Sequence, residues 1–131
     1  MIVGLGLDVC DIDRMRKNLE KHGVRFMEKV LSDDEVAYCT RKRDPATPCA
    51  GRFAAKEATI KALGAPKGMR FSDMTIHPAS DHAPPRVSLS GVAREAALRM
   101  GVTRTHLTIT HDANVAAAVV ILEAAPGFEL P

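Results

Sequence analysis

The chain has 131 residues, 46% hydrophobic and 26% charged, and 18 basic against 16 acidic side chains give a net charge of +2. This length and composition predict one globular domain, residues 1–131, and exclude a disordered, collagen-like or long coiled-coil chain. The longest apolar run, Ala113–Leu122, is too short for a membrane span, and the N-terminus lacks the pattern of a secretory signal, so we expect a cytoplasmic protein.

The first segment, Ile2–Cys10, is a short apolar run that we interpret as a buried strand. Strand alternation places three apolar side chains, Leu5, Leu7 and Val9, on one face. The other face carries Gly4, Gly6 and Asp8. Because glycine has no side chain, we expect room for a ligand on this face, beside the Asp8 carboxylate.

A basic helix is expected next, capped by Asp11 or Asp13 and stopped at His22–Gly23. Its charge favours an acidic protein or a phosphorylated small molecule as partner, with a merely solvated helix face as the alternative. With one tyrosine and no tryptophan in the chain, single-stranded nucleic acid is disfavoured. The basic residues of this stretch are Arg14, Arg16, Lys17, Lys21, Arg25 and Lys29.

Two more helices follow. Ser32-Asp33-Asp34-Glu35 has the form of a capping box and predicts a helix to about Lys42, before the helix breakers Pro45 and Pro48. The next helix is expected over Cys49–Leu63, with Gly64 as its stop signal.

From Phe71 onward the pattern changes to short strands. Strands are predicted at Met74–His77, Arg86–Ser90, His106–His111 and Val115–Glu123, with a helix at Ala93–Met100 and a hairpin turn at Asp112-Ala113-Asn114. We therefore expect an α+β fold, a single domain with a mostly antiparallel sheet packed against helices. Residues Pro126–Pro131 are expected to form a frayed tail.

The sulfur-containing and histidine side chains are assigned structural roles. Cys10, Cys39 and Cys49 lack C-x-x-C spacing and are expected to be buried free thiols. His77, His82 and His106 are interpreted as surface or strand residues rather than ligands. Five methionines are assigned to the core or to interfaces: Met15, Met27, Met69, Met74 and Met100.

The helix at Cys49–Leu63 carries a carboxylate where a helical wheel predicts burial. With 100° per residue and Phe53 at zero, Glu57 lies at about +40°, within the apolar sector that contains Ile60. A buried carboxylate is costly unless it is paired or holds a metal. One interpretation is a surface ion pair between Glu57 and Lys61, four residues apart.

Asp8 favours a second interpretation. Two carboxylates from separate elements, with lysines close by, suit a Mg²⁺ ion that takes phosphate oxygens as further ligands. Basic side chains can then bind the remaining phosphate charge.

Two motifs also resemble those of a known family. Gly4-x-Gly6-x-Asp8-x-x-x-Ile12, followed by Arg52-Phe-Ala-Ala-Lys56-Glu57-Ala-x-x-Lys61, looks like the paired signature of the 4′-phosphopantetheinyl transferases. The length and the late Thr110-His111 make the chain similar to the small holo-[acyl-carrier-protein] synthases, over Ile2–Glu123.

The resemblance implies transfer of phosphopantetheine from coenzyme A to a serine of apo acyl carrier protein, in support of fatty acid biosynthesis. It implies the phosphopantetheinyl transferase fold, and a homotrimer with active sites between subunits. By position, Asp8 and Glu57 would bind Mg²⁺, both acting with Lys61 in catalysis, and Arg14 would contact the carrier protein. The candidate substrate-binding residues are Arg52, Lys56, Lys61, Thr110 and His111.

Some alternatives stay open. The serine proton could be taken by Glu57, or through water by Asp33 or Asp34. Thr110 stands where the family commonly has serine, and Val115 where an aromatic residue is frequent. The competing functions are a binding module for an acidic partner, without enzymatic activity, and a Mg²⁺-dependent phosphohydrolase.

Overall fold

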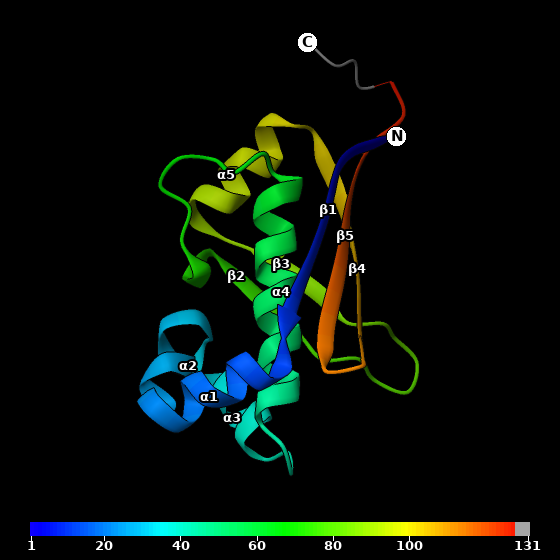
Figure 1. The fold of residues 1–131 in the computed structure, drawn as a ribbon. Coiled ribbons are helices and arrows are strands. Elements are labelled where there is room, and N and C mark those ends of the chain that lie inside the picture. The colour runs from blue at the N-terminus through cyan, green and yellow to red at the C-terminus, as the bar shows by residue number, and fades with distance from the viewer. Residues whose placement is uncertain (128–131) are drawn as a thin grey trace.

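The structure is a computed structural model that describes residues 1–127 (Figure 1). A long central helix lies against one face of an antiparallel sheet, with three short helices at one end and a smaller helix and strand pair behind. The elements are β1 Ile2–Asp11, α1 Ile12–His22, α2 Val24–Val30, α3 Asp33–Thr40, α4 Ala46–Ala62, the 3-10 turn η1 Phe71–Asp73, β2 Met74–His77, β3 Arg86–Leu89, α5 Gly91–Arg99, β4 Val102–Asp112 and β5 Val115–Ala124.

The main sheet has three strands in the order β1-β5-β4, all antiparallel, and β2-β3 form a separate antiparallel pair. Strand β5 lies in the middle and is almost all Ala, Val, Ile and Leu. The β4-β5 turn places Ala113 and Asn114 at positive φ, and the Asp112 side chain accepts a hydrogen bond from the Ala113 amide. The predictions of an α+β fold and of this hairpin are confirmed.

Glycine allows β1 to lie directly against α4. A Cβ atom at Gly6 would collide with the backbone carbonyl of Ala58, and one at Gly4 with that of Ala62. The expectation of ligand space on this face is therefore wrong, because the backbone of α4 fills it. Asp8, on the same face, is left beside α4 rather than over an open cavity.

In the part of the chain that the structure describes, nothing covers the opposite face of β1. Leu5, Leu7 and Val9 are 65%, 58% and 62% exposed, so β1 is buried on its glycine face only. The sequence pattern predicted a buried strand, and the alternation was right, but the apolar face is the open one. Exposed apolar surfaces are a common feature of interaction sites.

Two apolar cores pack against different parts of α4, one against the greater part of the helix and the other against its N-terminal part. One contains Ala54, Ala58, Met74 and Leu122 and fills the space between α4, the sheet and α5. The other packs the three N-terminal helices around Met15, Met27, Cys39 and Cys49. The alanine-rich sequence of α4 explains how one helix fits closely into both cores.

Helix boundaries differ from the predicted ones where proline was the guide. Helix α4 begins at Ala46, so Pro48 lies inside its first turn, where its missing N–H costs nothing. The expectation that Pro48 precedes the helix is wrong. Helix α2 was not predicted, whereas the Asp11 cap, the Gly23 stop and the Ser32–Glu35 capping box are confirmed.

The three cysteines are free, and Cys39 and Cys49 are completely buried while Cys10 is half-buried. Burial raises the pKa of the Cys49 thiol to about 12 and that of Cys39 to about 11. The prediction of buried free thiols is thus confirmed for Cys39 and Cys49, whereas Cys10 is free but only partly buried. Of the predicted tail, residues 128–131 lie outside the described residues. No helix within residues 1–127 has the length and apolar character needed to cross a membrane.

Candidate active site

Asp8 and Lys61 form the first part of the candidate site, where β1 crosses α4. The Lys61 ammonium donates to Asp8 Oδ1 at 2.9 Å and to the Leu7 carbonyl at 3.1 Å. The Lys61 side chain is 54% exposed and that of Asp8 is 17% exposed. Since much of the ammonium faces solvent, Lys61 can also reach a ligand.

Glu57 lies one turn before Lys61 on α4 and is half-buried. Burial raises the pKa of Glu57 above its ordinary value, the negative charge of Asp8 raises it further, and the Lys61 charge acts in the opposite direction. The two carboxylates therefore lie close enough to repel one another. The alternative of a Glu57–Lys61 ion pair is not realised in residues 1–127, because Lys61 pairs with Asp8 instead.

Lys56, the neighbour of Glu57, is completely buried. Its ammonium donates to Glu35 Oε1 and to the Val30 carbonyl, both at 2.8 Å, and to the Phe71 carbonyl at 3.4 Å. Three acceptors thus occupy its three protons. The prediction that Lys56 binds substrate is wrong, since no surface of its side chain is free to contact one.

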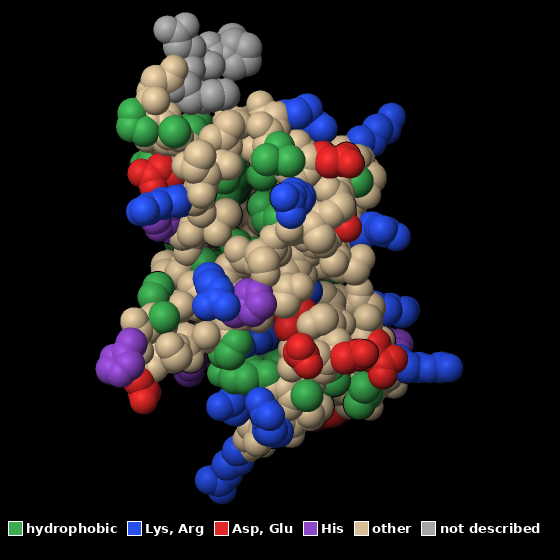
Figure 2. All heavy atoms as spheres, turned by 180° about the vertical axis from the view of Figure 1, so that it is seen from behind, with side chains coloured by type: hydrophobic (Ala, Val, Ile, Leu, Met, Phe, Trp, Pro, Cys, Tyr) green, Lys and Arg blue, Asp and Glu red, His purple; other side chains and the backbone are tan. Residues whose placement is uncertain are grey.

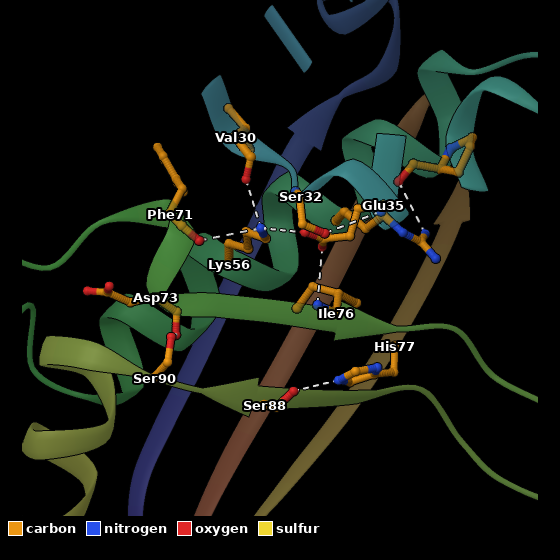
Figure 3. Close-up of polar contacts among 12 residues, drawn as sticks. Val30, Ser32, Glu35, Lys56, Phe71, Asp73, Ile76, His77, Ser88 and Ser90 are labelled. Atoms are coloured by element: carbon orange, nitrogen blue, oxygen red, sulfur yellow. Dashed lines mark hydrogen bonds and ion pairs between the residues drawn. The ribbon is translucent and has the colours of Figure 1, made fainter. Parts of the chain in front are cut away.

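Glu35 completes this buried network. Its Oε1 accepts from the Ser32 amide at 2.8 Å, and its Oε2 accepts from the Ile76 amide at 3.1 Å (Figure 3). Burial lowers the pKa of Lys56, and the Glu35 carboxylate opposes this shift. The pair joins α2, α3, α4, η1 and β2 around one point.

A second group of predicted residues lies elsewhere. Arg52, Thr110 and His111 line one pocket of about 430 Å³, between the start of α4 and the end of β4. Lys42 and Tyr38 line it too. Among the described residues of its wall there is one carboxylate, Asp44, which already accepts hydrogen bonds from Arg16 and Thr47. The pocket is therefore suited to an anion, and it is called the anion pocket below.

The two groups are separated within one chain. Asp8 lies on β1 and Thr110-His111 on β4, the outer strands of the sheet, which are about 10 Å apart across β5. On α4, Arg52 and Glu57 are five residues apart, which is about 140° around the helix. None of Asp8, Glu57 and Lys61 lines the pocket. The structure thus brings three predicted residues together at each of two places.

Arg14 is exposed on α1, at a small hollow that it shares with Phe53 and with Val9 and Cys10, which follow Asp8 on β1. A broader hollow of about 770 Å³ between α1 and α2 is lined by Lys21, Arg25, Lys29 and their neighbours. On the face opposite to that of Figure 1, basic side chains are spread over the whole height of the molecule (Figure 2). The carboxylates visible there gather mainly at the helical end.

Two residues of the site region were missed from the sequence. Glu35 was assigned only to a capping box, and Tyr38 was not singled out. The burial of Lys56 could have been predicted, because this residue lies at about −60° on the helical wheel, inside the same apolar sector as Ile60. Tyr38 gave no comparable signal.

Comparison with known proteins gives consistent results. The profile of the family described as the 4′-phosphopantetheinyl transferase superfamily matches residues 4–120. A holo-[acyl-carrier-protein] synthase of Anaeromyxobacter sp. (strain K) is 48% identical over 126 residues, covering 94% of this chain and 97% of its own length. One from Myxococcus xanthus is 45% identical, over 93% of this chain and 95% of its own.

Solved structures agree with this fold. A holo-ACP-synthase from Plasmodium yoelii matches with a TM-score of 0.81 at 29% identity, covering 95% of this chain and 97% of that one. The Helicobacter pylori holo-[acyl-carrier-protein] synthase, solved in complex with coenzyme A, matches with a TM-score of 0.76 at 32% identity, covering 91% and 99%.

Proposed function

The chain belongs to the 4′-phosphopantetheinyl transferase superfamily, and we propose that it acts as a holo-[acyl-carrier-protein] synthase. It transfers the 4′-phosphopantetheine group of coenzyme A to a serine of apo acyl carrier protein. Adenosine 3′,5′-bisphosphate is the other product. The observation that carries this proposal is the meeting of Asp8, Glu57 and Lys61 where β1 crosses α4.

Asp8 and Glu57 fit a divalent cation. The negative charges of these two carboxylates repel one another, and the pKa of Glu57 is raised partly because of Asp8. Residues 1–127 contain no cluster of three or more His, Cys, Asp or Glu side chains arranged for a metal. A site of two carboxylates suits Mg²⁺, which keeps waters and binds phosphate oxygens. When bound, Mg²⁺ would neutralise charge on the pyrophosphate.

In the transfer, the serine oxygen forms a bond to the β-phosphorus while the bond from that phosphorus to the bridging oxygen of adenosine bisphosphate breaks. Lys61 supplies a positive charge to the pyrophosphate, for which its exposed ammonium is suited. Glu57 takes the serine proton, directly or through water. Asp34 is less suited, since it lines a different hollow with Arg41 and His77.

We propose further that coenzyme A is bound between two copies of the chain. The carboxylates and the anion pocket lie on different sides of α4, so one copy would supply Asp8, Glu57 and Lys61, and its neighbour Arg52, Thr110 and His111. The uncovered apolar face of β1 supports an interface between copies. A homotrimer, as the family resemblance implies, would repeat this site three times.

The carrier protein would dock on the basic N-terminal helices. Arg14 is exposed on α1, and the hollow between α1 and α2 is lined by further basic side chains. An acidic carrier surface would be attracted to these charges, mainly through its rate of association.

Mass spectrometry tests the activity directly. Incubation with coenzyme A, Mg²⁺ and apo acyl carrier protein should raise the mass of the carrier by one phosphopantetheine group. D8N and E57Q should each reduce the rate by at least about a hundredfold while the circular dichroism spectrum is retained. An unchanged carrier mass with several carriers would contradict the proposal. Release of adenosine 3′,5′-bisphosphate without carrier would indicate a phosphohydrolase instead.

Mixing two inactive variants tests the shared site. D8N removes a carboxylate from the Asp8–Glu57–Lys61 part of the site, and H111A removes a side chain from the anion pocket. Each variant alone is therefore expected to have a low transfer rate. Refolded together, one interface in four would combine two intact halves, and about a quarter of the wild-type rate should return. Failure of the mixture to exceed the sum of its components would contradict a site built from two copies.

A further inference from the structure

Tyr38, in the last turn of α3, has two positive charges close to its ring. The Arg52 guanidinium carbon is 4.0 Å from the centre of the Tyr38 ring, and the Lys42 ammonium is 4.7 Å from it. Cations are attracted to the faces of aromatic rings at such distances. All three side chains line the anion pocket that also contains Thr110 and His111. One ring thus gathers two cations at the pocket wall.

Arg52 depends on this ring. Only 6% of the residue is exposed. Among the residues that the structure describes, its side chain forms one hydrogen bond, to the Pro48 carbonyl at 3.4 Å, and its Nε has no partner. Buried N–H groups are nearly always hydrogen-bonded, so a buried guanidinium with an unused donor is unusual. Within residues 1–127 no carboxylate forms an ion pair with Arg52. Its charge is therefore held in place without being neutralised.

The buried network next to this contact fixes the ring. Glu35, one turn before Tyr38 on α3, binds Lys56, one turn after Arg52 on α4. The two contacts, Glu35–Lys56 and Tyr38–Arg52, join the same pair of helices side by side. Helix α3 cannot turn or slide along α4 without breaking the buried ion pair. The Tyr38 ring is thus set at a defined place against the guanidinium.

We propose that Tyr38 is a positioning residue for nucleotide binding. It orients Arg52 and Lys42 so that both present their charge to a phosphate group of coenzyme A. The proposal rests on the function proposed above, in which this pocket receives the nucleotide. Tyr38 itself takes no part in the bond that forms or the bond that breaks.

Two substitutions separate the ring from the hydroxyl. Y38L removes the ring faces and should raise the KM for coenzyme A about five- to thirtyfold, with kcat and the KM for the carrier changed by no more than about twofold. Y38F keeps the ring and should restore the affinity. Isothermal titration with adenosine 3′,5′-bisphosphate should show the same ratio of dissociation constants, without the carrier present.

The outcomes are distinguishable. If the wild-type protein neither transfers phosphopantetheine nor binds adenosine 3′,5′-bisphosphate, the proposed function fails and this inference with it. If the wild type does both and Y38L keeps the same KM for coenzyme A, only the role of Tyr38 is overturned. A parallel loss of kcat, carrier affinity and Tm in Y38L, which would indicate a purely structural residue, also overturns it.

Discussion

Two lysines of the same helix form ion pairs with carboxylates of other elements, in very different surroundings. The Lys56–Glu35 pair is buried, with side chains 1% and 2% exposed, whereas in the Lys61–Asp8 pair they are 54% and 17% exposed. The N–O distances are nearly equal, at 2.8 and 2.9 Å. The two ion pairs therefore have nearly the same geometry and differ in how far their side chains are exposed to solvent.

The difference decides what each lysine can do. Lys56 donates to three fixed acceptors and has no proton left for a ligand. Lys61 donates to two and is half in water, so a phosphate can replace water around it at little cost. A buried pair holds elements together, and a partly solvated pair can change partners during a reaction.

Breaking the buried pair should have the largest effect. K56M leaves the Glu35 carboxylate buried without its partner and should lower the free energy of unfolding by about 3–5 kcal/mol, measured by urea denaturation. The double variant E35L/K56M, which removes both charges, should recover part of the loss. If K56M were as stable as the wild type, the Lys56–Glu35 pair would not hold these elements together.

K61M is the matched substitution in the exposed pair. It should change the free energy of unfolding by no more than about 1 kcal/mol, because exposed ion pairs contribute little. Its transfer rate should nevertheless fall about ten- to a hundredfold, through the loss of charge at the pyrophosphate. Steady-state kinetics and urea denaturation on one preparation measure both. A stable and fully active K61M would remove Lys61 from the proposed chemistry.

The smallest effect on stability is expected at Glu57, which lies between the two lysines in the sequence. The pKa of Glu57 is raised in the folded protein, so ionisation of Glu57 opposes folding. The free energy of unfolding of the wild type therefore falls as pH rises through that pKa. E57Q should therefore be slightly more stable than the wild type at pH 7 in EDTA, and equally stable near pH 3. Thermal unfolding across this range checks it. A constant difference at all pH values would contradict the assignment.

The sequence predicted the site better than the surfaces around it. Asp8 and Glu57 could be paired from a strand face and a helical wheel, and their carboxylates do lie close enough to interact. Lys56 was misassigned because the family motif drew attention to its charge, although its position on the same wheel indicated burial. Periodicity describes burial, and for this residue it was the better guide.

Other features could not be predicted from one chain. The glycine face of β1 was interpreted as open space, since sequence alone does not tell which element will approach a strand. Tyr38 becomes meaningful only once α3 packs against α4 and brings Arg52 over its ring. Contacts between elements distant in sequence leave no periodic pattern, and so they need the fold.

The close approach of β1 to α4 also sets the distance between the acidic side chains of the proposed active site. Strand and helix touch through backbone atoms at Gly6 and Ala58, so the gap between Asp8 and the side chains of α4 is fixed by the absence of a single methyl group. A larger residue at position 6 would push the helix outward and draw the acidic groups away from one another. Chemistry at this centre can thus be lost through a residue that never meets a substrate atom.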